Sequence, residues 1–237
     1  MLKMVFAQFI FLVIFISQFY DNAECISFFH FTQDPPPVRD IALMARYIVH
    51  HSDWATLSYI GNQSFMDGMP MGRVYSISDG TINNSSGVPY IMASPMDLSF
   101  QDVVKTKNCS LVLSLAQSDY CKKKSYDPED PRCAQLTLTG KFVKLDKDDP
   151  EWNVAKTALW TRHPVMRKWN NLVPGHHWQF AKVNIEHITL IDTFGGRKYP
   201  TIAEYFKATP TFNYWPKLRH SVITVKKNVI IDEEFIN

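Results

Sequence analysis

The sequence lacks a strong bias of charge: 25 Lys and Arg residues nearly balance 23 Asp and Glu residues, and the formal net charge is +2. A nucleic-acid binder gathers basic residues on one surface, and scattered basic residues at this net charge argue against direct nucleic-acid binding. The G-x-S-x-G, H-E-x-x-H, P-loop and G-x-G-x-x-G signatures are also missing, which lowers the expectation of catalysis. With 46% apolar and 14% aromatic residues, the chain can still bury an ordinary core.

A strong hydrophobic run occurs once, at residues 4–16. Its length is typical of a signal-peptide core and short for a bilayer crossing. Ala23-Glu24-Cys25 supplies the small residues that cleavage requires, so residues 1–25 are predicted to be a signal peptide and the mature chain to begin near Ile26. The alternative is an uncleaved anchor, which the lack of a stop-transfer charge cluster in residues 20–24 disfavours. We therefore expect a secreted or endolysosomal protein that is not inserted in a membrane after cleavage.

Four Asn-x-Ser triplets match the acceptor pattern for N-glycosylation, at Asn62, Asn83, Asn84 and Asn108. Asn62 and the Asn83/Asn84 pair lie in turn-like stretches rich in Gly and Ser, where a glycan projects into water. Adjacent Asn83 and Asn84 crowd each other, and Asn108 lies near the edge of an apolar strand. We expect two or three glycans.

Of the four cysteines, Cys25 is predicted to leave with the signal peptide. Cys121 and Cys133 bracket a polar loop with two prolines, and an oxidising compartment permits a disulfide between them. Such a bridge contributes about 3 kcal/mol in the chain-entropy model. Cys109 then remains as a buried thiol or an intermolecular partner. Pairing of Cys109 with Cys121 or Cys133 is the alternative.

Hydrophobic periodicity predicts an α+β chain that is mainly antiparallel β. Apolar residues recur at helical spacing from Val38 to Val49, a second helix follows Asp149-Pro150 and ends at Pro164, and a short third one lies near residues 201–206. The predicted strands are 55–60, 72–78, 88–93, 110–116, 134–145, 178–184 and 187–192. About seven strands with few helices favour a closed barrel, which leaves no open edge.

Several polar groups are candidates for chemistry. The pairs His50-His51 and His176-His177 lack a third ligand at a defined spacing, so we expect no metal site there. Lys122-Lys-Lys124 is either a docking site for an acidic partner or, more commonly for such runs, a solvated loop. No catalytic residue is assigned.

Arg162-His163-Pro164 is the strongest candidate for an anionic cofactor. The guanidinium can hold a phosphate, and the imidazole can orient a ring or a proton. Helix capping is the simpler interpretation, because cations near a helix C-terminus offset its dipole and proline ends the helix. We expect no bound cofactor, and name Arg162 and His163 as the residues that would hold one.

A series of short motifs, in this order and spacing, resembles the CREG family of secreted glycoproteins over about residues 35–206. The motifs include Ser76-Ile-Ser-Asp-Gly80, Ser86-Gly-Val-Pro-Tyr90, Leu115-Ala-Gln117, Arg162-His-Pro164 and Phe194-Gly-Gly196. The resemblance implies the FMN-binding split barrel of the pyridoxamine phosphate oxidase type, with a vestigial cofactor pocket and no enzymatic activity.

The resemblance further implies a homodimer that influences cell growth and differentiation. Receptors of the mannose-6-phosphate type would bind its glycans, and any repression of transcription would be indirect. The competing function is a flavin- or haem-binding oxidoreductase that uses the barrel's dimer interface, with Arg162 clamping a phosphate or propionate beside His163.

Three departures from the family pattern limit how far the family's properties can be expected of this chain. Residues 170–177 replace a compact family stretch, the acceptor triplets lie in the first half of the chain, and the segment after Ala208 matches nothing in the family. The expected organisation is a signal peptide (1–25), a short N-terminal segment (26–34), the split-barrel domain (35–208) and a C-terminal extension (209–237).

Overall fold

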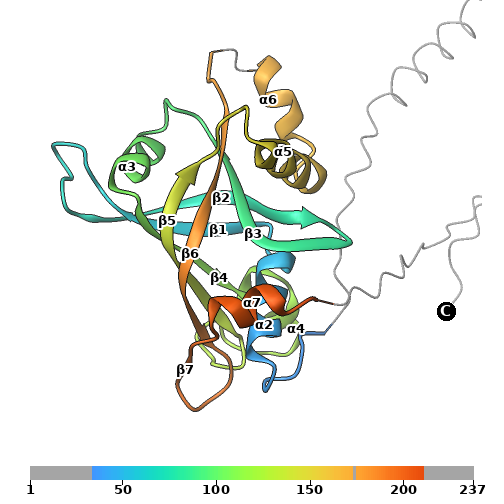
Figure 1. Cartoon of the computed structure of the whole chain (residues 1–237). Helices are drawn as coiled ribbons and strands as arrows, with labels where there is room; N and C mark the ends of the chain where they lie inside the picture. Colours follow the sequence, from blue (N-terminus) through green and yellow to red (C-terminus); the bar gives the residue numbers. More distant parts are fainter. Residues whose placement is uncertain (1–33, 173–174, 211–237) are drawn as a thin grey trace, which may run out of the picture. The chain divides into compact units, whose positions relative to one another are not determined.

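The computed structural model describes residues 34–172 and 175–210 (Figure 1). The predicted signal peptide and nearly all of the C-terminal extension lie outside these residues. The helices are α2 (Ile41–His51), α3 (Leu98–Thr106), α4 (Tyr120–Lys123), α5 (Pro150–Arg162), α6 (Met166–Leu172) and α7 (Ile202–Lys207), with a 3-10 turn η1 (Leu115–Gln117). The strands are β1 (Trp54–Ile60), β2 (Pro70–Thr81), β3 (Asn84–Ala93), β4 (Asn108–Ser114), β5 (Gln135–Lys144), β6 (Gln179–Ile191) and β7 (Arg197–Lys198).

The strands form a closed antiparallel barrel. Their order is β3-β2-β1-β4-β5-β6-β7, and a further pairing of β3 with β6 closes the first six into a ring while β7 adds to β6 from outside. Closure satisfies the backbone groups that an open sheet would expose at its edges. The expected α+β class with a split-barrel-like, mainly antiparallel fold is confirmed.

Alternation of side chains fills the barrel interior. In β1, Ala55, Leu57 and Tyr59 are buried while the residues between them face outward. The same alternation in β4 buries Cys109, Leu111 and Leu113. These side chains join residues of β2, β5, β6 and α2 in one apolar cluster, so the barrel is a packed core and not an open channel.

A second apolar cluster lies under α5 and α6, on the outside of the barrel. Asp149 caps the N-terminus of α5 by accepting from the Glu151 N–H, and Pro150 occupies its first turn. Ala155, Ala158 and Leu159 then pack with buried residues of β3 and β6. In the view of Figure 1, α5 and α6 lie on one side of the barrel, and α2 and α7 gather at another.

The elements differ from the expectation in two respects. The two strands expected at 178–184 and 187–192 form one strand, β6, whose register against β5 shifts near Gly140. That bulge places both Glu186 and His187 on the exposed side and thereby breaks the period-2 pattern. Helices α3, α4 and α6 were not expected. Helices α4 and α6 are too short to show a period, and the polar Asp102 on the buried side of α3 interrupts its apolar stripe. None of the described helices combines the length and the hydropathy needed to cross a membrane.

Candidate functional site

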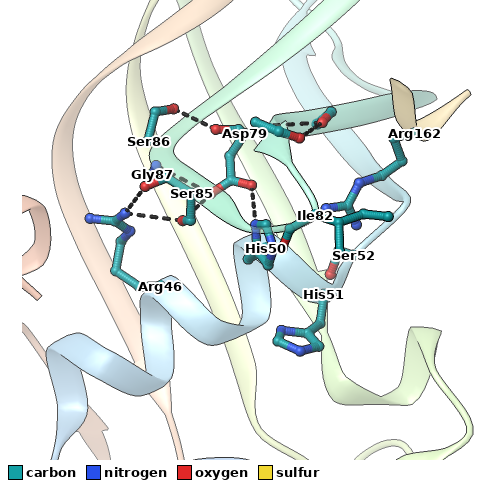
Figure 2. A network of polar contacts seen from close by, with 12 residues as sticks. Arg46, His50, His51, Ser52, Asp79, Ile82, Ser85, Ser86, Gly87 and Arg162 are labelled. Carbon is teal, nitrogen blue, oxygen red and sulfur yellow. Dashed lines mark hydrogen bonds and ion pairs between the residues drawn. The ribbon is translucent and has the colours of Figure 1, made fainter. Parts of the chain in front are cut away.

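A buried ion pair joins α2 to the β2–β3 hairpin (Figure 2). His50 Nδ1 lies 2.7 Å from Asp79 Oδ1, and both side chains are fully buried. The other ring nitrogen, Nε2, lies 3.0 Å from the Ile82 carbonyl oxygen. Both oxygens are acceptors, so the ring lies between two acceptors, one of which is the Asp79 carboxylate.

The hairpin supplies the remaining partners of Asp79. The Ser85 hydroxyl and the Gly87 N–H donate to Oδ2, and the Ser86 hydroxyl donates to the backbone carbonyl. Burial acts to raise the pKa of Asp79, but the hydrogen bond and charge of His50, the Ser85 hydroxyl and the Arg162 charge outweigh it, and the pKa lies below its ordinary value. Ser85 bonds to Asp79 and not to His50, so this trio does not supply an activated serine.

Arg46 extends the network to the last described helix. Its guanidinium donates to the Ser85 carbonyl at 2.6 Å and to the Tyr205 carbonyl at 3.2 Å. The Tyr205 hydroxyl donates to the Gly87 carbonyl at 2.7 Å. Gly87 has φ +79°, and a Cβ there would meet Arg46 at 2.6 Å. The network thus ties α2, the hairpin and α7 together.

Arg162 and His163, the residues named for an anionic cofactor, are occupied by contacts within the fold. Arg162 donates to Asp53 at 3.3 Å, and its side chain is 4% exposed. His163 Nε2 donates to the Ile77 carbonyl at 2.9 Å, and burial lowers the pKa of this imidazole. His163 is also the C-cap of α5. Neither residue lines the large cavity of the molecule.

That cavity has a volume of about 710 Å³ and lies against β2, β3, α3 and α6. Its size falls within the range of small-molecule sites. Five methionines line it, Met66, Met71, Met92, Met96 and Met166, together with the aromatic residues Tyr59, Phe65, Tyr75, Trp169, His176 and Trp178. Methionine and aromatic walls adapt to apolar ligands of irregular shape.

Charged groups in the cavity lining are one cation and two anions. Arg73 Nε donates to Asp97 at 3.0 Å, and the Tyr75 hydroxyl donates to the same carboxyl group at 2.8 Å. Asp102 is 5% exposed, and its carboxylate accepts from the neutral amide of Gln63 at 2.7 Å. Asp97 therefore neutralises Arg73, while Asp102 has no ion-pair partner among the described residues.

This lining does not fit a flavin phosphate. A phosphate carries close to two negative charges, and sites that hold one supply free guanidinium, ammonium or N–H groups. The guanidinium of Arg73 is already paired with Asp97, and Asp102 would repel the anion. Asp102 would repel the carboxylates of haem in the same way. On the described residues, the cavity accommodates an apolar ring but opposes an anionic group.

On the aromatic side of the cavity, two polar atoms have no hydrogen-bond partner in the described part of the chain. Trp178 stacks on His176 with ring centroids 5.4 Å apart and lies 5.1 Å from the ring of Trp169. Trp178 Nε1 and His176 Nδ1 are both buried and bond to no described residue. Buried polar atoms of this kind are seldom left unsatisfied, so they mark a place for a ligand or a water.

An outer face of the barrel carries no Asp, Glu, Lys or Arg. Three outward positions from each of five neighbouring strands form it, in matched registers. These positions, named here the uncharged face, are Gly72, Val74 and Ser76; Trp54, Thr56 and Ser58; Ser110, Val112 and Ser114; Gln135, Thr137 and Thr139; and His187, Thr189 and Ile191. Val112 at its middle is 40% exposed, and Val74 on its outermost strand is 59% exposed.

The four glycosylation candidates differ in their surroundings. Asn83 and Asn84 are exposed at the hairpin between β2 and β3, and Asn62 is half-buried in the loop between β1 and β2. Asn108 is exposed at the start of β4, where Lys141 donates to its side chain. Asn108 faces the same side as Ser110 and therefore borders the uncharged face.

The structure pairs Cys121 with Cys133, whose Cα atoms lie 5.5 Å apart. Cys109 is a free thiol inside the barrel, and burial raises its pKa to about 12, which keeps it protonated. The described residues contain no cluster of three His, Cys, Asp or Glu side chains that suits a metal. Lys122, Lys123 and Lys124 are exposed around α4.

Sequence reasoning did not single out Arg46, Asp79 or Asp102. Asp79 lies within one of the motifs that carry the family resemblance, which was the available signal. Asp102 occupies the buried side of α3, beside Val103, and a carboxylate at such a position signals either a partner or a ligand.

Comparison with known proteins adds three findings. The family model described as CREG, beta-barrel matches residues 36–207. Protein CREG1 of Gallus gallus is 42% identical over 177 residues, which span 74% of this chain and 90% of that protein, and Protein CREG1 of Homo sapiens is 39% identical over 174 residues, which span 73% and 77%. Among solved structures, a haem-binding protein from Mycobacterium smegmatis superposes with a TM-score of 0.56 at 16% identity, over 75% of this chain and 63% of that one.

Proposed function

The chain belongs to the CREG family, and on this premise we propose that it is a secreted or endolysosomal glycoprotein that acts by binding and not by catalysis. It works as a homodimer and influences growth and differentiation through a receptor. Its effect on transcription is indirect, because a chain delivered to the secretory pathway does not meet DNA. Glycans at the acceptor triplets would offer a ligand to receptors of the mannose-6-phosphate type.

One observation carries the non-enzymatic part of this proposal. The groups that resemble catalytic or cofactor-binding residues are engaged in contacts within the fold: Asp79 pairs with His50, and Asp53 pairs with Arg162. The cavity in turn presents an excess of carboxylate, which opposes the anionic groups of flavin mononucleotide and haem.

The uncharged face supports the homodimer. These five strands belong to a closed barrel of six, so the uncharged face curves around the barrel, and its central part on β1, β4 and β5 is the proposed contact. Small uncharged side chains there let two copies approach closely, and a two-fold axis presents the same face twice. A second copy is therefore the proposed occupant.

A visible spectrum of the glycosylated protein, purified from a secretory host, tests the binding role. We expect a colourless dimer whose spectrum and thermal stability do not change with added flavin mononucleotide. A stoichiometric flavin or haem band would overturn the proposal. Uptake by cells with and without competing mannose-6-phosphate tests the receptor class, and unchanged uptake would remove that class.

The second candidate function is an oxidoreductase with a flavin or a haem. The cavity volume and the unpartnered atoms of His176 and Trp178 favour a small-molecule ligand. The related fold of a haem-binding protein is an analogy of fold alone. The charges described above disfavour both cofactors, and the same spectrum decides between the two functions.

A further inference from the structure

We propose that the cavity against β2, β3, α3 and α6 binds an apolar organic cation, such as an aromatic amine or a quaternary ammonium compound. The proposal rests on the binding role proposed above and names its ligand class. It joins three independent properties of the cavity: a buried carboxylate that pairs with no cation among the described residues, aromatic walls, and a buried N–H group that bonds to no described acceptor.

Asp102 supplies the charge. Its side chain lies in the cavity wall, is almost fully buried, and accepts one hydrogen bond from the neutral Gln63. A buried carboxylate without a cation is costly, because it gives up hydration without a compensating charge. A positively charged ligand removes that cost. Asp97 does not serve this role, since Arg73 and Tyr75 already occupy it.

The aromatic wall supplies the second interaction. Trp178 contacts both Trp169 and His176, and all three side chains line the cavity. A cation over a free indole face is attracted by the negative charge of that face, most strongly where the cation is desolvated. The five methionines give the apolar part of such a ligand a polarisable surface.

Trp178 Nε1 adds a condition on the ligand. Because this N–H is buried and bonds to no described residue, a ligand with an acceptor oxygen or nitrogen satisfies it. The favoured ligand is thus a cation with an apolar ring and one acceptor group. Simple alkali cations do not meet these requirements.

Titration of the full glycosylated protein at pH 7.4 tests the proposal, with calorimetry and tryptophan fluorescence as readouts. The probes are (4-methoxybenzyl)trimethylammonium as the cation, N-phenyl-1-naphthylamine as the neutral compound and flavin mononucleotide as the anion. We expect the wild type to bind the cation and the neutral compound and to ignore the anion. Asp102→Asn should weaken cation binding about tenfold and leave the neutral compound within twofold.

Asp67→Asn is the matched control, because it removes the same charge from an exposed position of the neighbouring β1–β2 loop. Trp178→Phe provides a second variant in case Asp102→Asn does not fold, and should weaken the cation several-fold. Equal affinities of the Asp102→Asn and Asp67→Asn proteins, or no cation binding at millimolar concentration, would overturn the ligand class. Stoichiometric binding of flavin mononucleotide would overturn both this inference and the proposed function. Failure to bind the cation, with no binding of flavin mononucleotide, would overturn this inference alone, so the two failures are distinguishable.

Discussion

His50 and Asp79 form an ion pair at the centre of the polar network, with Nδ1 and Oδ1 2.7 Å apart and neither side chain exposed. The pair joins the C-terminal turn of α2 to β2, and Ser85 and Arg46 extend it toward α7. A cation at the end of a helix also offsets the helix dipole. The pair therefore holds three segments that are far apart in the sequence.

Asp79→Ala should destabilise the fold by about 3–5 kcal/mol, because it removes the carboxylate partner of the buried His50 ring and of the Ser85 hydroxyl. The free energy of unfolding in urea measures this loss. Asp67→Ala, at an exposed position, is the control and should change stability by less than about 0.5 kcal/mol. A cost below about 1 kcal/mol for Asp79→Ala would show that the pair does not hold the fold together.

His51, next to this pair, should make the fold sensitive to acid. Burial lowers the pKa of His51 to about 3; the charges of His50 and Arg162 act in the same direction, and the Tyr47 carbonyl and Asp79 oppose them. Between about pH 6.5 and pH 3 the unfolded chain binds a proton that the folded chain does not, so stability falls as the pH falls. Between pH 7 and pH 5 the loss is at most about 2 kcal/mol.

His51→Phe, which retains a ring to stack on Tyr47, should flatten this dependence. Chemical denaturation at pH 7, 6 and 5 gives the slope. The lowered pKa of Asp79 affects stability only below the ordinary carboxyl range, so the aspartate does not contribute in this window. An unchanged slope in the variant would assign the acid sensitivity to other groups, such as His163.

Val112→Arg should convert the proposed dimer to a monomer, because it places a charge in the middle of the uncharged face. Val154→Arg, which adds the same charge at a half-exposed position of α5, is the control. Sedimentation at micromolar concentration measures the mass of each variant. If Val112→Arg remains a dimer, a different face mediates pairing. If the wild type is a monomer, the proposal that the protein is a homodimer is wrong.

The same face predicts the state of Asn108. Because this residue borders the face, a glycan on it would obstruct the second copy. Mass spectrometry of peptides from the dimer should find Asn108 unmodified. Full occupancy of Asn108 in a stable dimer would contradict the proposed interface.

Reduction of the Cys121–Cys133 bridge should lower stability by about 3 kcal/mol, since the bridge closes a 12-residue separation that is otherwise free in the unfolded chain. Thermal denaturation of Cys133→Ser against the wild type measures the effect. Cys109→Ser is the comparison, because it alters a buried thiol that forms no bridge. Equal melting temperatures of wild type and Cys133→Ser would show that the bridge is not formed in the purified protein.

The barrel could be predicted from the sequence because its inner residues alternate strictly with outer ones, as in β1 and β4. The long β6 could not, because a bulge interrupts the alternation where Glu186 and His187 are both exposed. Helix α5 was predicted from Asp149-Pro150 at its start and Pro164 after its end, whereas α6 is too short to show a period.

The site was less accessible to sequence reasoning. Arg162 and His163 attract attention because a cation and an imidazole precede a proline, yet tertiary contacts with Asp53 and Ile77 occupy them. Asp102 lies in α3, which was not expected, and its hydrogen bond with Gln63 comes from the distant β1–β2 loop. Contacts between segments that are far apart in the sequence decide which polar side chains are paired within the fold.

The hydrogen bonds of the β2–β3 hairpin restrict when its acceptor triplets are open to glycosylation. Ser85 and Ser86 are the hydroxyl residues of the acceptor triplets that begin at Asn83 and Asn84, and in the folded hairpin both hydroxyls are donated to Asp79. An enzyme that reads either triplet needs that hydroxyl released. If the hairpin is glycosylated as proposed, sugar transfer there and closure of the barrel compete for the same hydroxyl groups, and the transfer has to come first.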